Sequence, residues 1–306
     1  MRSKIICSAL LILCLLVVCS SYAEESESMS LEKLISLRAE IDEQIANAVY
    51  DVDRSSYSLD GLIYVSNGSE IRINTYEGSN NELIIPQEID GVPVTMIQEN
   101  AFKDNKKITS VVIPEGISVI PTEAFSGCSN LTSIVLPSTI KTIQRWAFLY
   151  ANKLSSIVFP EGLTTLESAA FQRAEGLSGI LVLPTTLTSK AGYTFSRCDK
   201  LTGVIVQSDI PLCDADFGYV KFVYIREGCE VTIEENPFQD GTLEVIIIPA
   251  SVTSISDEAF SKCSKLTIVA PPGSYAERYA KNHFIVCDTE AYERMTKEYD
   301  EQYLNN

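Results

Sequence analysis

Residues 131–148 read LTSIVLPSTIKTIQRWAF and contain one complete unit of a repeat. Ile134 and Leu136 are separated by one residue, which is the apolar alternation expected of a β-strand. Pro137 ends that strand because proline has no N–H to donate to a neighbouring strand. Ala147 and Phe148 close the unit, the small residue allowing a close approach and the ring filling the interior.

The same unit recurs along some 160 residues. The interval between successive phenylalanines is 23, 23, 23, 24, 22, 21 and 22 residues. In five of the eight units, alanine precedes the phenylalanine, and in five a proline stands eleven residues before it. The phenylalanines are Phe102, Phe125, Phe148, Phe171, Phe195, Phe217, Phe238 and Phe260. A fixed period of this length indicates a stacked repeat architecture.

One such coil has two open apolar faces and cannot fold alone, whereas stacking covers them with strands about 4.8 Å apart. The sequence resembles the BspA-type leucine-rich-repeat family of bacterial and protist surface proteins. The carrying segments are residues 134–143 with Ala147-Phe148, residues 124–131, and a closing segment at 270–280. The resemblance covers about residues 60–287. It implies an α/β class, β-rich, right-handed leucine-rich-repeat solenoid of about eight coils of 21–24 residues with short terminal helices, and a role in adhesion or binding.

The N-terminus predicts secretion. Arg2 and Lys4 precede an apolar run that ends before small residues at 21–23, as in a signal peptide. A lipoprotein signal ending at Cys19 is the alternative. We expect a signal peptide at 1–23, an amphipathic helix and linker at 24–60, the solenoid with its caps at 61–287 and an acidic helical tail at 288–306. No later segment is apolar enough to enter a membrane, so we expect a secreted or cell-surface protein.

Composition argues against several functions. Loss of Arg2 and Lys4 moves the formal charge from -17 to -19, and such a surface repels nucleic acid. His283 is the single histidine, which is too few for a metal cluster or a Ser-His-Asp triad. Calcium around Asp214 and Asp216 lacks further ligands in phase. We expect no catalytic residues, no metal site and no cofactor, and a glycan-processing enzyme would need an acidic pair that the repeats do not place.

Six cysteines follow the signal segment. Three of them stand three residues after a repeat phenylalanine, where other units hold Asn, Ala or Gly: Cys128, Cys198 and Cys263. That slot selects small residues, and Cys128 and Cys198 lie three coils apart, about 14 Å, too far for a disulfide. We expect these three to be buried free thiols, and leave open whether Cys213 and Cys229 pair.

A binding surface is predicted on the strands, where residues between the buried positions face outward. One outward column stays apolar or aromatic: Val112, Val135, Val158, Ile205, Tyr224 and Ile247, with Phe222 beside Tyr224. The plain alternative is that β-branched residues suit any strand. Contiguous apolar surface often marks a partner site, so we expect this column to be exposed and to bind an extracellular protein or glycan.

The repeat breaks between residues 187 and 236, which we take as a candidate functional zone. Lys190 occupies the slot held elsewhere by Ile120, Ile143, Leu166 and Ile255, and we expect a local shift that lets it reach solvent, since burying a lone charge is costly. Gln207 and Arg226 replace the strand-ending proline. Trp146 and Tyr193 fill a water-facing slot and are further candidates. Drift in a degenerate repeat is the alternative.

The two ends are predicted to be helical. Residues 30–49 carry apolar side chains at helical spacing, and this helix either packs on the first coil or dimerises, so homo-oligomers remain open. In the tail, Tyr292, Met295, Tyr299 and Tyr303 share one helical face and dock on the last coil or bind a partner. Two functions stay in competition: a non-catalytic binding module, and a structural spacer that assembles through these helices.

Overall fold

The computed structural model describes residues 57–213, 215–238 and 241–304. The chain divides into two units, residues 1–57 with 65–69 and residues 58–64 with 70–306. In the described part of the first unit, the Asn67 side chain accepts a hydrogen bond from the Ser69 N–H at 2.9 Å. The second unit carries the repeats and is described by itself below. The predicted signal peptide, the Cys19 alternative and the helix at 30–49 lie outside the described residues.

Short strands dominate the part of the chain that the structure describes. They are β1 (Tyr57–Leu59), β2 (Leu62–Ser66), β3 (Ile71–Tyr76), β4 (Glu82–Ile84), β5 (Glu88–Ile89), β6 (Val92–Ile97), β7 (Ser110–Val112), β8 (Val119–Ile120), β9 (Ser133–Val135), β10 (Thr142–Ile143), β11 (Thr165–Leu166), β12 (Ser178–Val182), β13 (Ser189–Lys190), β14 (Lys200–Val206), β15 (Phe222–Ile225), β16 (Thr232–Ile233), β17 (Val245–Ile247), β18 (Ser254–Ile255), β19 (Thr267–Val269) and β20 (Val286–Asp288). Among the described residues, the helices are α3 (Tyr275–Asn282), α4 (Tyr292–Tyr299) and a π-helical continuation, η2 (Asp300–Leu304).

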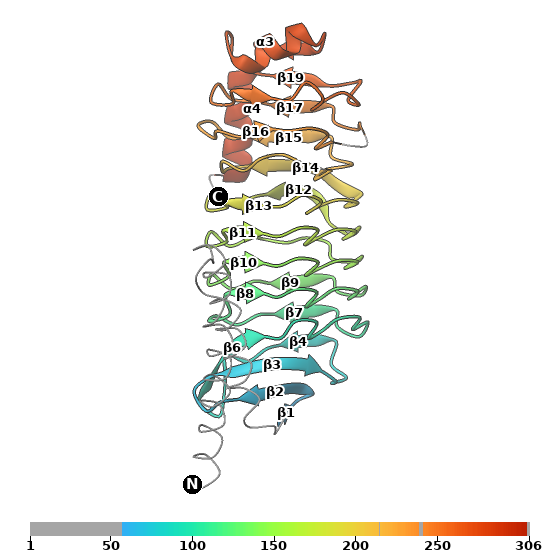
Figure 1. The fold of residues 1–306 in the computed structure, drawn as a ribbon, viewed down its shortest axis with the longest axis vertical. Coiled ribbons are helices and arrows are strands. Elements are labelled where there is room, and N and C mark those ends of the chain that lie inside the picture. The colour runs from blue at the N-terminus through green and yellow to red at the C-terminus, as the bar shows by residue number, and fades with distance from the viewer. Residues whose placement is uncertain (1–56, 214, 239–240, 305–306) are drawn as a thin grey trace, which may run out of the picture. The chain divides into compact units, whose positions relative to one another are not determined.

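Most coils contribute one strand to a sheet on one side and a two-residue strand to a second sheet on the return side (Figure 1). The first set is β4-β7-β9, continued by β12-β14-β15-β17-β19-β20. The return set is β8-β10-β11-β13 and, further on, β16-β18. The pairs within these sets are parallel, for example Val111 with Ile134, and the β12–β14 pair has one register shift at Gly179/Ile180. The β-rich repeat solenoid predicted from the sequence is confirmed.

The phenylalanines form a continuous stack inside the coils. From Phe102 to Phe195 the centroids of neighbouring rings lie 4.9 to 5.5 Å apart with nearly parallel planes. The N–H of Phe125 donates to the Ala147 carbonyl at 2.8 Å, and the N–H of Phe148 to the Ala170 carbonyl at 2.8 Å. The stack loosens in the shortened coils, where the Phe217 and Phe238 centroids are 6.5 Å apart and the planes differ by 26°.

The turns beside this stack use left-handed backbone at residues other than glycine. Trp146, Ala169 and Tyr193, in successive coils, have φ of 58°, 57° and 63°. Four residues further on, Tyr150, Arg173 and Arg197 have φ of 59°, 58° and 62°. Left-handed backbone costs an L-residue energy, and here it is held by hydrogen bonds between coils, such as Trp146 N–H to the Ser168 carbonyl at 3.3 Å.

Helix α3 closes the C-terminal end of the stack. Ser274 caps it by accepting a hydrogen bond from the Glu277 N–H at 3.2 Å, the usual role of serine at a helix start. Its Tyr279 ring meets Phe260 edge-on, with centroids 5.9 Å apart. The last repeat therefore presents its apolar face to a helix. No helix in the described part of the chain is long and apolar enough to cross a membrane.

The cysteines confirm the small-residue reading of their slot. Cys128, Cys198 and Cys263 are buried and free of disulfides. The Cys128 Sγ donates to the Phe102 carbonyl at 3.0 Å, and burial raises the pKa of this thiol to about 12. Cys213 and Cys229 are both buried, and no disulfide joins them.

Replacing a ring in the middle of the stack should destabilise the solenoid strongly. We expect Phe148→Ala to lower the free energy of unfolding by about 3 to 5 kcal/mol, because it removes a fully buried ring and leaves a cavity between two neighbours. Urea denaturation followed by circular dichroism measures this. Val158→Ala, on a side chain 82% exposed, is the control and should change stability by less than about 0.5 kcal/mol. Equal effects of the two substitutions would contradict this account of the stack.

Candidate functional site

An apolar column runs along the outer face of the main sheet, one residue per coil. The register places Ile84 opposite Val112 and Val112 opposite Val135. After the coil of Val158, the same column continues through Val182, Ile205, Tyr224, Ile247 and Val269. Its members therefore lie about 4.8 Å apart from coil to coil, as the sequence pattern predicted.

The N-terminal half of this column is open to solvent. Ile84 is 71% exposed, Val135 57% and Val158 82%. Val112, between them, is also exposed. The column is flanked on the same face by Ser110 and Ser133. The prediction that Val135 and Val158 face water is confirmed, and together the four residues form what we call the open column.

The C-terminal half is covered by the chain's own tail. Ile205, Tyr224 and Ile247 are fully buried, and Phe222 is half-buried. The expectation that these four side chains are exposed is therefore wrong. The covering residues come from α4 and η2, which lie along the sheet face across several strands (Figure 1). They are Ala291, Tyr292, Met295, Tyr299, Tyr303 and Leu304.

The tail is held by aromatic and polar contacts. The Tyr299 ring stacks on Phe222 with centroids 4.4 Å apart. The Tyr224 hydroxyl donates to the Asp300 carboxylate at 2.8 Å, and the Tyr292 hydroxyl donates to Glu227. Burial first, and then the accepting carboxylates, raise the pKa of both tyrosines. Of the two outcomes open for the tail in the sequence, docking on the coils is the one that the structure contains.

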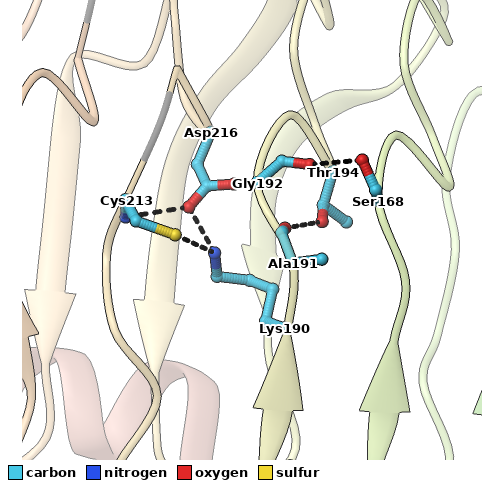
Figure 2. A network of polar contacts seen from close by, with 7 residues as sticks. All are labelled: Ser168, Lys190, Ala191, Gly192, Thr194, Cys213 and Asp216. Carbon is cyan, nitrogen blue, oxygen red and sulfur yellow. Dashed lines mark hydrogen bonds and ion pairs between the residues drawn. The ribbon is translucent and has the colours of Figure 1, made fainter.

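Lys190 does not reach solvent. Its side chain is completely buried and forms an ion pair with Asp216, which is equally buried (Figure 2). The expectation of a local shift toward water is wrong, because the next coil brings a carboxylate to the ammonium group. Asp216 stands directly before Phe217, in the slot that holds alanine in most other units. Two exceptions to the repeat, in neighbouring coils and of opposite charge, thus compensate each other.

The neighbouring Cys213 also contacts this pair. Asp216 Oδ2 also accepts a hydrogen bond from the Cys213 N–H at 3.1 Å, and the Cys213 Sγ lies 4.0 Å from the Lys190 Nζ. Asp216 Oδ1 has no hydrogen-bond partner among the described residues. Burial raises the pKa of the Asp216 carboxyl, and the charge of Lys190 opposes that shift. A buried pair of this kind is strongly coupled, so each partner depends on the other.

The rest of the zone at 187–236 contains a polar recess. A depression of about 540 Å³ is lined by Thr185, Leu187, Thr188, Gln207, Ser208, Asp209, Arg226, Glu227, Gly228 and Cys229. Arg226 donates to the Gln207 side chain at 3.2 Å, so the residues that replace the strand-ending proline bond to each other across the two coils. Gln207 also donates to the Leu183 carbonyl at 3.2 Å. These hydrogen bonds link the coils at the strand ends where other units have a proline.

Trp146 and Tyr193 lie at the left-handed turn, away from the open column in sequence. Tyr193 is 44% exposed and Trp146 is half-buried. The Arg145 guanidinium carbon is 4.2 Å from the centroid of the Trp146 ring. The prediction that this slot faces water is confirmed for Tyr193, and Trp146 reaches solvent in part.

His283 lies at the end of α3 and contacts structural groups. Its Nδ1 is 2.9 Å from the Tyr279 carbonyl and its Nε2 is 3.2 Å from the Asp257 carboxylate. Within the described ranges, no three His, Cys, Asp or Glu side chains form a group that could hold a metal ion. Asp214, considered for calcium, lies outside those ranges.

Replacing Lys190 and Asp216 by the residues that other units carry should show whether the two side chains depend on each other. We expect Lys190→Ile alone to lower the free energy of unfolding by about 3 to 5 kcal/mol, because Asp216 is left buried without its partner. Asp216→Ala alone should be similarly harmful. The double variant carries the residues that other units place in these slots and should regain most of the loss. Urea denaturation of all four proteins tests this, and a double variant as unstable as the sum of the single ones would refute the coupling.

Loosening the tail should expose it to protease. Tyr299→Ser removes the ring that stacks on Phe222, and we expect trypsin to cleave native protein at Arg294 and Lys297 about tenfold faster, since opening costs less free energy. Glu298→Ser changes the adjacent residue, whose side chain is 60% exposed, and serves as control. Equal cleavage rates for both variants would show that the aromatic contacts do not hold the tail.

Comparisons with known proteins agree with this architecture. The model of the BspA type leucine rich repeat region matches six copies over residues 95–217 and 231–294. No curated protein sequence matches the chain significantly.

Several solved structures are similar to this chain. A leucine rich repeat protein of T. pallidum is 20% identical, with a TM-score of 0.50, over 77% of this chain and 99% of that one. A leucine rich cell surface protein of Faecalibacterium prausnitzii is 18% identical, with a TM-score of 0.37, over 74% of this chain and 97% of that one. The pneumococcal vaccine antigen PcpA is 16% identical, with a TM-score of 0.39, over 78% of this chain and 49% of that one. Since the family model covers more than half of the sequence, the chain belongs to the BspA-type leucine-rich-repeat family.

Proposed function

We propose that the protein is a non-catalytic binding module, secreted or held at the cell surface, that binds an extracellular protein through the open column. The observation that carries this proposal is the exposure of four apolar side chains in successive coils: Ile84, Val112, Val135 and Val158. The first three lie opposite one another in paired strands. Contiguous exposed apolar surface on a folded monomer commonly marks a partner site.

The covered half of the column supports the choice of a protein partner. There, the same sheet face holds an amphipathic helix through tyrosine and methionine side chains. The open half offers the same geometry of β-branched side chains at one-coil intervals. A partner helix or strand with an apolar face can therefore pack on the open column as α4 packs on the covered half.

The alternative of a structural spacer that assembles through its terminal helices finds less support. The apolar face of α4 is already used against the chain's own coils, with Tyr292 buried. Assembly through α4 would require it to leave this surface. The segment at 30–49 stays a candidate for self-association.

Isosteric substitutions test the open column. Val135→Thr with Val158→Thr keeps shape and strand preference and removes apolar surface. A partner is first captured from host mucosal extract by residues 24–306, identified by mass spectrometry and purified. We expect the double variant to bind the purified partner about tenfold more weakly, since apolar anchors carry much of the affinity at such sites.

The matched control is Val286→Thr, on a valine that is 65% exposed in the terminal strand β20. It should bind within about twofold of the unmodified protein. Equal affinity of the double variant and the control would overturn the proposed face. Failure to capture any protein, with the bait shown to be folded by circular dichroism, would favour the spacer.

A further inference from the structure

A second surface, separate from the open column, is formed by arginine and aromatic side chains at the left-handed turns. We call it the turn patch and define it by Arg145, Trp146, Tyr150, Arg173, Tyr193 and Arg197. Three of the six arginines in residues 61–287 belong to it. In a chain of formal charge -17, such a local concentration of arginine is unusual.

Equivalent backbone conformations align these side chains. Trp146 and Tyr193 share φ near 60° with Ala169, which lies between them. The hydrogen bonds between coils keep the turns in step: the N–H of Ala169 donates to the Gly192 carbonyl at 3.3 Å, and that of Arg173 to the Ser196 carbonyl at 2.8 Å. Side chains that leave stacked coils from the same conformation point the same way, so each turn position forms a column along the solenoid.

The aromatic members present rings to solvent around a small central residue. Tyr150 is 45% exposed and Tyr193 44%. Trp146 and Tyr193 are two coils apart, about 10 Å along the axis, and Ala169 between them is buried. Along this turn column a buried small residue therefore separates two aromatic side chains.

The arginines keep their hydrogen-bond donors available. Arg145 stacks over Trp146 and Arg173 lies 5.5 Å from the Tyr150 ring centroid. Stacking occupies the face of a guanidinium group and leaves its N–H edge for a planar anion. Among the described residues, the side chains of Arg145, Arg173 and Arg197 form no ion pair and no side-chain hydrogen bond, whereas Lys103, Lys190, Lys221, Lys281, Arg294 and Lys297 all pair with carboxylates.

Two of the acids near the patch are already engaged. Glu123, in the column of Trp146, forms an ion pair with Lys103. Glu167 accepts a hydrogen bond from the Arg145 backbone N–H at 2.9 Å. Glu175 and Asp199 follow Arg173 and Arg197 by two residues, and salt at physiological strength screens the more distant acids beyond about 8 Å. The unpaired arginines are therefore the groups of this patch that can hold an anion.

We propose that the turn patch binds an anionic polysaccharide, the arginines holding its carboxylate or sulfate groups while the exposed rings stack on its sugar faces. Arginine matches planar anions through two parallel hydrogen bonds. Exposed rings flanked by polar groups suit a ligand that has both apolar C–H faces and charges. This proposal is independent of the protein partner assigned to the open column.

Binding of residues 24–306 to immobilised heparin tests the patch, with hyaluronan, dextran and poly-glutamate as companion ligands. We expect heparin binding that weakens with salt and none to dextran. Hyaluronan carries carboxylates without sulfates, so its binding or non-binding identifies which anion the arginines hold. Poly-glutamate should bind far more weakly, since it offers charge without sugar faces.

Variants are chosen from residues that the turn accepts. Asn100 holds the slot of Trp146 and Tyr193 with φ of 60°, so Trp146→Asn with Tyr193→Asn keeps the backbone and should weaken heparin binding about fivefold. Arg145→Gln with Arg173→Asn should weaken it about tenfold. Arg294→Asn, on an exposed arginine of α4, is the control for charge and should leave the affinity within about twofold.

Three results would overturn the proposal: no heparin binding above that of dextran, poly-glutamate bound as tightly as heparin, or variants of the patch that bind as well as Arg294→Asn. The second would assign the surface to an acidic peptide instead. Circular dichroism and urea denaturation of each variant exclude unfolding as the cause of lost binding.

Discussion

The solenoid depends on the contact between equivalent phenylalanine rings in successive coils. Each ring from Phe102 to Phe195 has a parallel neighbour at 4.9 to 5.5 Å, and the backbone beside it bonds to the following coil. Neither the strands, two to seven residues long, nor the left-handed turns would persist without this stacking. Stability in such arrays is carried by the interfaces between neighbours, so every surface described above takes its geometry from the rings beneath it.

The repeat made the fold and part of the surface predictable. Spacing alone located Phe148 inside and Val135 and Val158 outside, because a strand alternates its faces whatever lies around it. It could not show that Tyr224 is covered. The tail's apolar face at Tyr292 and Tyr299 was evident in the sequence, but periodicity does not say which surface a helix meets, and the docking site lies some 70 residues away in the chain.

The prediction that Lys190 reaches solvent was wrong for a related reason. A charge in an apolar slot has two remedies, escape to water or a buried counter-ion, and the choice depends on register between coils of unequal length. The sequence did contain a clue at Asp216, which replaces the usual alanine in the neighbouring unit and has the opposite charge. The turn patch was predictable only in part. Trp146 and Tyr193 differ in residue type from the other units at their slot, whereas the arginines become neighbours only because the turns stack.

The tail also sets how much of the sheet remains free. The apolar column continues from coil to coil. The tail helix α4 with η2 runs in the same direction as the column and so crosses several strands. A coil occupies about 4.8 Å along the solenoid and a helical residue advances about 1.5 Å, so about three residues of tail correspond to one coil. The length of the C-terminal tail therefore determines how many coils it covers. Adding or deleting one helical turn moves the boundary between the covered and the exposed part of the column by about one repeat, without altering any residue of the solenoid.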